Sequence, residues 1–136
     1  MQSLSRIFNL FPVIPVYAHC DVPCGIYDPK PAQIAAATVL KMVQKLKEYP
    51  EDDLNNRVRV IWTKEEHARI CKEEILILWT DYFKPEHLEK FPDLHETFWK
   101  AAKLCSKNKQ NADEDAAQEL VKAVDQISEI FNKTKK

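Results

Sequence analysis

A short run of closely spaced metal-binding side chains lies near the amino terminus. His19 and Cys20 are adjacent, Cys24 follows after three residues, and Pro23 and Gly25 flank the second cysteine. Two cysteines at this spacing are by themselves a weak metal signal, because two thiols in an ordinary loop give the same pattern. His19 makes the metal-binding signal stronger, because the residues before it predict that cleavage leaves His19 as the first residue.

Residues 1–18 are mostly apolar and end in Val16-Tyr17-Ala18. Small residues at this point are typical of a processing site, so residues 1–18 are expected to be a removable leader. An ordered N-terminal arm is the alternative. Pro12 and Pro15 interrupt the apolar run and the basic region is minimal, which makes the segment a poor export signal. We expect a cytoplasmic protein, with export as the alternative.

Cleavage between Ala18 and His19 would create a compact set of donor atoms. The α-amine of His19, the amide nitrogen of Cys20 and the thiolates of Cys20 and Cys24 form a square plane of two nitrogens and two sulfurs. Such tetragonal sites suit nickel(II) or copper(II), whereas zinc(II) prefers a tetrahedron. The His19 imidazole can add an axial bond. Pro23 fixes φ inside the loop, and Gly25 is expected to relieve crowding behind Cys24.

Two blocks of the chain resemble a known family. The sequence HCDVPCGIYDP at residues 19–29 is similar to the nickel hook of nickel-dependent superoxide dismutases, and LWTDYFKPEHLEKFPDL at residues 78–94 resembles a second block of that family. The resemblance implies a four-helix-bundle subunit, a homohexamer with one nickel ion per subunit, and disproportionation of superoxide to dioxygen and hydrogen peroxide. It also implies a dedicated maturation peptidase that exposes the His19 amine.

The resemblance assigns roles to individual residues. The metal ligands are His19, Cys20 and Cys24, while Asp21, Tyr27 and Tyr82 line the approach of the small anion or lie close to the metal.

One departure from the family concerns the axial imidazole. Many members hold it with a glutamate from the first helix and an arginine from the second, and the positions that align by spacing are Ala35 and His67. His67 is therefore a candidate replacement partner for His19, although residues 64–69 are charged and typical of a solvated helix face. Lys84 is a second weak candidate, because its charge could attract an anionic substrate.

Helical periodicity predicts four elements after residue 30. Apolar residues recur at spacings of three and four over 31–49, 53–82, 91–105 and 116–131, with a polar connection at 106–112. These helices predict an all-α fold, an antiparallel up-down four-helix bundle over residues 31–136. Residues 19–30 precede it as an irregular metal-binding hook.

Composition excludes several functions. The net charge of −1 disfavours a nonspecific nucleic-acid binder, and one glycine excludes glycine-rich nucleotide loops. No apolar run is long enough to span a membrane. Cys71 and Cys105 are most simply small buried hydrophobes, with a disulfide left open, and Trp62, Trp79 and Trp99 are expected in the core or at a subunit interface.

Two other functions use the same residues. A non-catalytic nickel- or copper-binding protein would need the amine, amide and thiolates but no axial imidazole or nearby tyrosines. A thiol-disulfide exchanger would use Cys20 and Cys24 as a redox pair, but such enzymes place two residues between the thiols in a fold with strands. Nickel content of the processed protein separates both from a dismutase.

Overall fold

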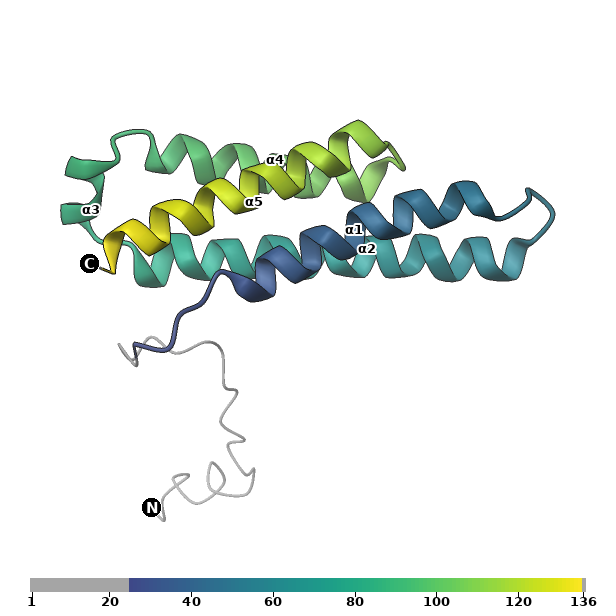
Figure 1. The fold of residues 1–136 in the computed structure, drawn as a ribbon, viewed down its shortest axis with the longest axis horizontal. Helices are drawn as coiled ribbons and strands as arrows, with labels where there is room; N and C mark the ends of the chain where they lie inside the picture. The colour runs from purple at the N-terminus through teal and green to yellow at the C-terminus, as the bar shows by residue number, and fades with distance from the viewer. Residues whose placement is uncertain (1–24, 136) are drawn as a thin grey trace, which may run out of the picture.

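Four long helices form the body of the protein in the computed structural model, which describes residues 25–135 (Figure 1). All regular secondary structure in this part of the chain is helical. The long helices are α1 (Lys30–Glu48), α2 (Leu54–Ile77), α4 (Leu94–Gln110) and α5 (Glu114–Thr134), and two short elements, η2 (Leu78–Tyr82) and α3 (Pro85–Lys90), join α2 to α4.

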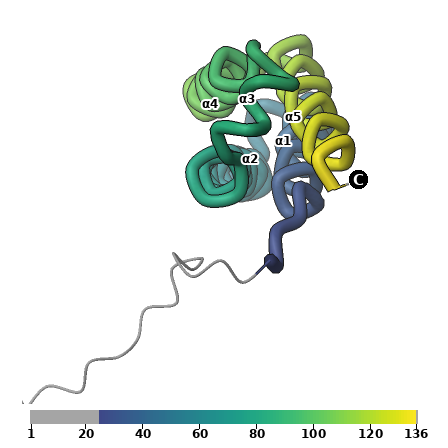
Figure 2. The backbone as a smooth tube through the Cα atoms, turned by 90° about the vertical axis from the view of Figure 1, so that its left-hand side faces the viewer, coloured from purple at the N-terminus to yellow at the C-terminus, as the bar shows by residue number. Residues whose placement is uncertain are grey.

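The long helices alternate in direction and close into a ring. Viewed end-on, α1 packs between α2 and α5, and α4 packs on the other side of the same two helices (Figure 2). The turn between α1 and α2 and the turn between α4 and α5 lie at one end of the bundle, while α3 and the carboxyl terminus lie at the other (Figure 1). The predicted antiparallel up-down bundle is therefore confirmed.

Local sequence signals explain where the long helices begin and end. Asp53 accepts a hydrogen bond from the backbone of Asn56 at the start of α2, and Asp113 caps α5 by accepting from Asp115. Such caps satisfy backbone N–H groups that have no partner within the helix. Pro31 occupies the first turn of α1, where its missing N–H costs nothing. None of the described helices is long and apolar enough to cross a membrane.

The second predicted helix ends in a way that periodicity does not reveal. Its last turn, Leu78–Tyr82, is a π-helix in which Phe83 N–H donates to the Leu78 carbonyl at 3.2 Å. Lys84 is then extended because it precedes Pro85, and that proline starts the short helix α3. The sequence analysis placed no helix at 85–90, so α3 is an addition to the prediction.

The predicted connection at 106–112 was too long, because α4 continues to Gln110. Asn108 is fully buried there and donates to the carbonyls of Leu104 and Ala116, both at 2.9 Å. Lys64 reaches the same point from α2. Its buried ammonium donates to the carbonyls of Asn108, Lys109 and Asn111.

Lys64 also corrects the expectation of a solvated face at 64–69. Burial holds the pKa of its ammonium below the usual value, since the charged form has lost water. The carbonyls that it contacts carry the negative end of the α4 dipole, which favours a cation. Farther along the same segment, Arg69 pairs with Glu66 at 2.6 Å on the exposed side of α2, as the charge pattern indicates.

The core holds the remaining two cysteines. Cys71 of α2 and Cys105 of α4 are fully buried and free. Trp79 of η2 stacks on Phe98 of α4, an antiparallel register that brings Cys71 level with Cys105. A hydrogen bond with Cys105 and burial raise the pKa of the Cys71 thiol, so that thiol is protonated. Both cysteines are buried and act as small core side chains.

Candidate functional site

The chain enters the bundle through Gly25, which precedes α1 at the end where α3 lies. Gly25 has a φ of +71°, in the left-handed region that favours glycine. A methyl group added there would meet no described atom within 4 Å. The crowding expected behind Cys24 involves a residue outside the described part of the chain, whereas the backbone conformation of Gly25 by itself favours glycine.

Two tyrosines from distant parts of the sequence meet at this end. Tyr27 lies just after Gly25 and is only 9% exposed, and Tyr82 closes the π-helical turn. Their ring centroids are 5.5 Å apart with the planes tilted by 56°. The structure thus brings together two residues that the sequence assigned to one site, and the contact fixes where the segment preceding residue 25 joins the bundle.

An aromatic cluster surrounds Tyr82. The Phe131 ring lies 4.5 Å away, the Phe83 ring 5.0 Å away, and the His87 imidazole stacks on it at 5.7 Å. His87 accepts a hydrogen bond from the Lys84 backbone through Nδ1, which fixes its neutral tautomer. Sequence analysis gave His87 no role, because a histidine near a helix start has no periodic signal.

The Tyr82 hydroxyl contacts the last turn of α5. Its oxygen lies 2.7 Å from the Thr134 hydroxyl oxygen. Sequence analysis missed Thr134, since a threonine in a lysine-rich terminal segment looks like the frayed end of a helix. It could not be linked to Tyr82 without knowing that α5 ends beside η2.

Two lysines give this end of the bundle positive charge. Lys84 is exposed and lies two residues after Tyr82. The Lys135 ammonium lies 4.4 Å from the centroid of Phe131, the ring that packs on Tyr82. An anion that approaches the tyrosines therefore meets two cationic side chains.

His67 lies elsewhere on α2. It precedes Tyr82 by fifteen residues, which corresponds to about 22 Å along the helix axis. Its Nδ1 lies 2.9 Å from the Thr63 carbonyl, which can only accept, so Nδ1 donates and Nε2 can accept. The described part of the chain does not bring His67 to the two tyrosines, and its role stays a prediction.

Ala35, the other position of the altered clamp, is buried in the contact between α1 and α2. Arg57 of α2 donates to the carbonyls of Leu46 and Tyr49 at the end of α1. Counting back along both antiparallel helices from that contact places Ala35 level with His67. The two positions thus lie at about the same level of the bundle.

The metal ligands expected from the sequence, His19, Cys20 and Cys24, and the substrate-lining Asp21 lie outside the described residues. Within 25–135, no three His, Cys, Asp or Glu side chains are close enough together to hold a metal ion. The structure describes the residues that directly follow those ligands in the sequence, Gly25 and Tyr27, and the aromatic cluster that Tyr27 contacts.

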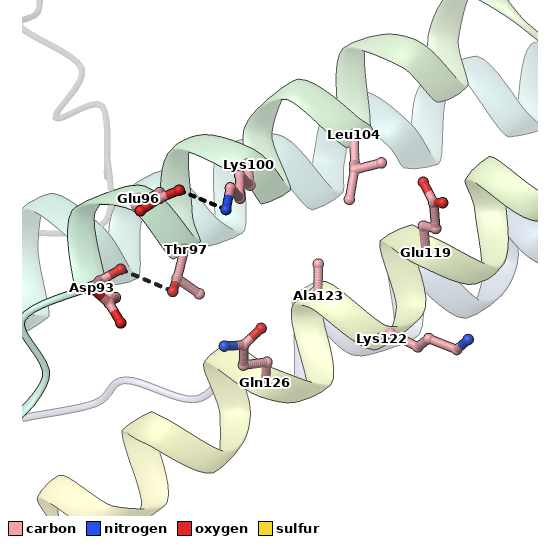
Figure 3. Close-up of a pocket in the computed structure, with 9 residues that line it drawn as sticks. All are labelled: Asp93, Glu96, Thr97, Lys100, Leu104, Glu119, Lys122, Ala123 and Gln126. Atoms are coloured by element: carbon pink, nitrogen blue, oxygen red, sulfur yellow. Dashed lines mark hydrogen bonds and ion pairs between the residues drawn. The ribbon is translucent and has the colours of Figure 1, made fainter.

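A groove between α4 and α5 has a volume of about 430 Å³ (Figure 3). Its charges are mixed, and the Lys100 ammonium in it is already paired with Glu96 at 2.6 Å. It contains none of the residues that the sequence selected. We therefore assign the site to the aromatic end of the bundle.

The fold and this site define a class: an antiparallel four-helix bundle with an N-terminal segment anchored on tyrosines at one end. Residues 15–135 match the family model described as nickel-containing superoxide dismutase. The chain belongs to that family, which confirms the resemblance noted from the sequence.

Individual relatives agree over nearly the whole chain. A nickel superoxide dismutase of Streptomyces seoulensis is 41% identical over 133 residues, and one of Streptomyces coelicolor is 40% identical over 133 residues, each alignment covering 98% of both chains. The native structure of a nickel superoxide dismutase superimposes with a TM-score of 0.82 at 39% identity, covering 87% of this chain and 100% of that one. An apo structure has a TM-score of 0.78 at 35% identity, covering 82% and 98%.

Proposed function

We propose that this protein is a nickel superoxide dismutase that converts two superoxide ions and two protons into dioxygen and hydrogen peroxide. Family membership supports the activity, and the observation that carries it to this chain is the contact between Tyr27 and Tyr82 at 5.5 Å. That contact joins the predicted hook to the second family block at residues 78–94. A protein that only carried metal would have no need of two tyrosines there.

The donor set of the hook fits nickel. The His19 amine and imidazole, the Cys20 amide and the thiolates of Cys20 and Cys24 would hold the metal, and this combination of nitrogen and soft sulfur donors suits nickel(II). When bound, nickel would supply the one-electron redox chemistry, between its divalent and trivalent states, that a ping-pong disproportionation of superoxide requires.

The remaining residues of the site bind and orient the substrate. Asp21 and Tyr27 line the approach, and Tyr82 closes it from the bundle side, where Phe131 and His87 pack on its ring. Lys84 and Lys135 attract the anion, an effect that raises the association rate and weakens as salt is added.

A role for His67 in holding the His19 imidazole favours a second subunit. Tyr27 contacts Tyr82, which lies about 22 Å from His67 along the axis of α2 and η2. Cys24 is only three residues before Tyr27, a span of at most about 11 Å. His19 would lie close to Cys24, because both would bind the same metal ion. We infer that His67 reaches the imidazole of a neighbouring chain in the homohexamer, with its Nε2 accepting the hydrogen bond.

The surface of α2 supports assembly of this chain into a homo-oligomer. Leu54, Val58, Ile61 and Trp62 are 69%, 62%, 40% and 68% exposed and recur at helical spacing on one face. We call these four residues the α2 stripe. A contiguous exposed apolar surface that includes a tryptophan is typical of a protein interface.

Charges placed in the α2 stripe should break the oligomer. We expect Val58→Asp combined with Trp62→Asp to lower the native mass below that of a hexamer, because unpaired carboxylates would be buried in the contact. Ile34→Asp is the matched control, since Ile34 is also exposed but lies on α1. Light scattering after size-exclusion chromatography measures the masses, and an unchanged mass in the double variant would remove the stripe from the interface.

Maturation and location complete the proposal. A dedicated peptidase cuts between Ala18 and His19, and we place this step in the cytoplasm. The free thiols of Cys71 and Cys105 are consistent with a reducing compartment.

The activity is tested on protein that begins at His19. After loading with nickel we expect one nickel ion per subunit and rapid decay of superoxide after pulse radiolysis, with apoprotein and copper-loaded protein as controls. Stoichiometric nickel binding without accelerated decay would favour the alternative, a non-catalytic nickel- or copper-binding protein.

A further inference from the structure

The last turn of α5 contacts the site through a hydroxyl group that the proposed mechanism does not use. The Thr134 oxygen lies 2.7 Å from the Tyr82 oxygen and 2.6 Å from the Phe131 carbonyl oxygen. Both contacts are short enough to be hydrogen bonds. They connect the carboxyl end of the bundle to the tyrosine that the family block at 78–94 contributes.

Counting protons gives this pair of bonds a direction. The Phe131 carbonyl can only accept, so the single proton of the Thr134 hydroxyl is donated to it. In the other contact Thr134 must then accept, and Tyr82 must donate. The chain of bonds runs from the phenol to the threonine and ends on a carbonyl in the last turn of α5, where carbonyls have no partner within the helix.

Packing and hydrogen bonding therefore act on Tyr82 from opposite ends of the side chain. Its ring is held by Phe131 and His87, and its hydroxyl is fixed by Thr134. Because Tyr82 donates its one phenolic proton to Thr134, only its ring and its oxygen lone pairs are left to interact with the rest of the site. Its position depends on an interaction made 52 residues away in the sequence.

We propose that Thr134 is a positioning residue of the dismutase site. It holds the Tyr82 hydroxyl against the end of α5 and so determines where the Tyr82 ring lies relative to the Tyr27 ring. The inference rests on the proposed function in one respect, that Tyr82 lines the site. Thr134 itself contacts neither substrate nor metal in this scheme.

Three variants separate positioning from stability. Thr134→Val keeps the shape of the side chain and removes the acceptor, while Thr134→Ser keeps the hydroxyl and should restore it. Thr38→Val is the matched control, because Thr38 also donates to a carbonyl of its own helix, that of Ile34 at 2.8 Å, but lies on α1 with an exposed hydroxyl.

The first readout requires no metal. In full-length protein labelled with ¹³C-tyrosine, the ring signals of Tyr82, assigned with Tyr82→Phe, should shift in Thr134→Val and keep their wild-type positions in Thr134→Ser and Thr38→Val. Unshifted Tyr82 signals in Thr134→Val would overturn the proposal, whether or not the protein proves to be a dismutase.

The second readout is a double-mutant cycle in nickel-loaded protein that begins at His19. Thr134→Val should lower kcat/KM by about 3- to 10-fold, the loss expected for one hydrogen bond, and should have no further effect in the Tyr82→Phe background. An equal loss in both backgrounds would show a purely structural role and overturn the proposal. Absence of activity in the wild type would count against the proposed function alone, and the tyrosine signals would then decide the role of Thr134.

Discussion

Full-length protein supplied with nickel is expected to show no dismutase activity, whereas the same chain beginning at His19 is expected to be fully active. Before cleavage the His19 nitrogen belongs to a peptide bond, and an amide that keeps its proton is a poor metal donor. One corner of the square plane is then missing. The bundle should be unaffected, because its first helix begins at Lys30.

A chain that begins one residue earlier, at Ala18, is the matched control. It also has a free α-amine, but its nitrogen is displaced by one residue, and the five-membered chelate ring with the Cys20 amide is lost. We expect this chain to be as inactive as the full-length protein, with an identical circular dichroism spectrum. Equal rates of superoxide decay in all three proteins would show that the His19 amine is not a ligand.

Replacing either hook cysteine is expected to abolish both activity and the thiolate-to-nickel absorption. Cys20→Ser and Cys24→Ser each exchange a soft thiolate for a hydroxyl, a harder and less donating ligand. Thiolates bring the potential of the nickel couple into the range in which superoxide can both reduce and oxidise it, so loss of one should stop both half-reactions.

The buried cysteines provide the matched control for the same chemical change. Cys71→Ser and Cys105→Ser should keep the absorption and the activity, because these thiols lie in the core between α2 and α4 and a raised pKa keeps Cys71 protonated. Both variants should instead lower the free energy of unfolding by about 1–3 kcal/mol, because a hydroxyl is buried in place of a thiol. Near wild-type turnover in either hook variant would remove thiolate ligation from the mechanism.

The main helices could be predicted because their signals are local. The apolar stripe of α1 depends on residues three or four positions apart, and the structure confirms it. The caps at Asp53 and Asp113, which were not predicted, are formed by residues equally close in sequence. The connection at 106–112 was misjudged because its polar residues have partners far away in sequence. Lys64, which arrives from α2, supplies the donor that lets the end of α4 be buried.

The same distinction applies to the site. Tyr27 and Tyr82 could be selected because each lies in a block with a family pattern, and the structure places their rings in contact. His87 and Thr134 could not, since their importance depends on where α3 and the end of α5 meet η2. The roles of the hook residues stay predictions, because those residues lie outside the described part of the chain.

The burial of Ala35 limits which side chains this position can carry. Ala35 is 1% exposed, so a glutamate introduced alone would bury a carboxylate without its arginine partner, at a cost of several kcal/mol. An arginine introduced alone at His67 would in turn lack its carboxylate. Positions 35 and 67 are therefore expected to accept a glutamate and an arginine together rather than singly.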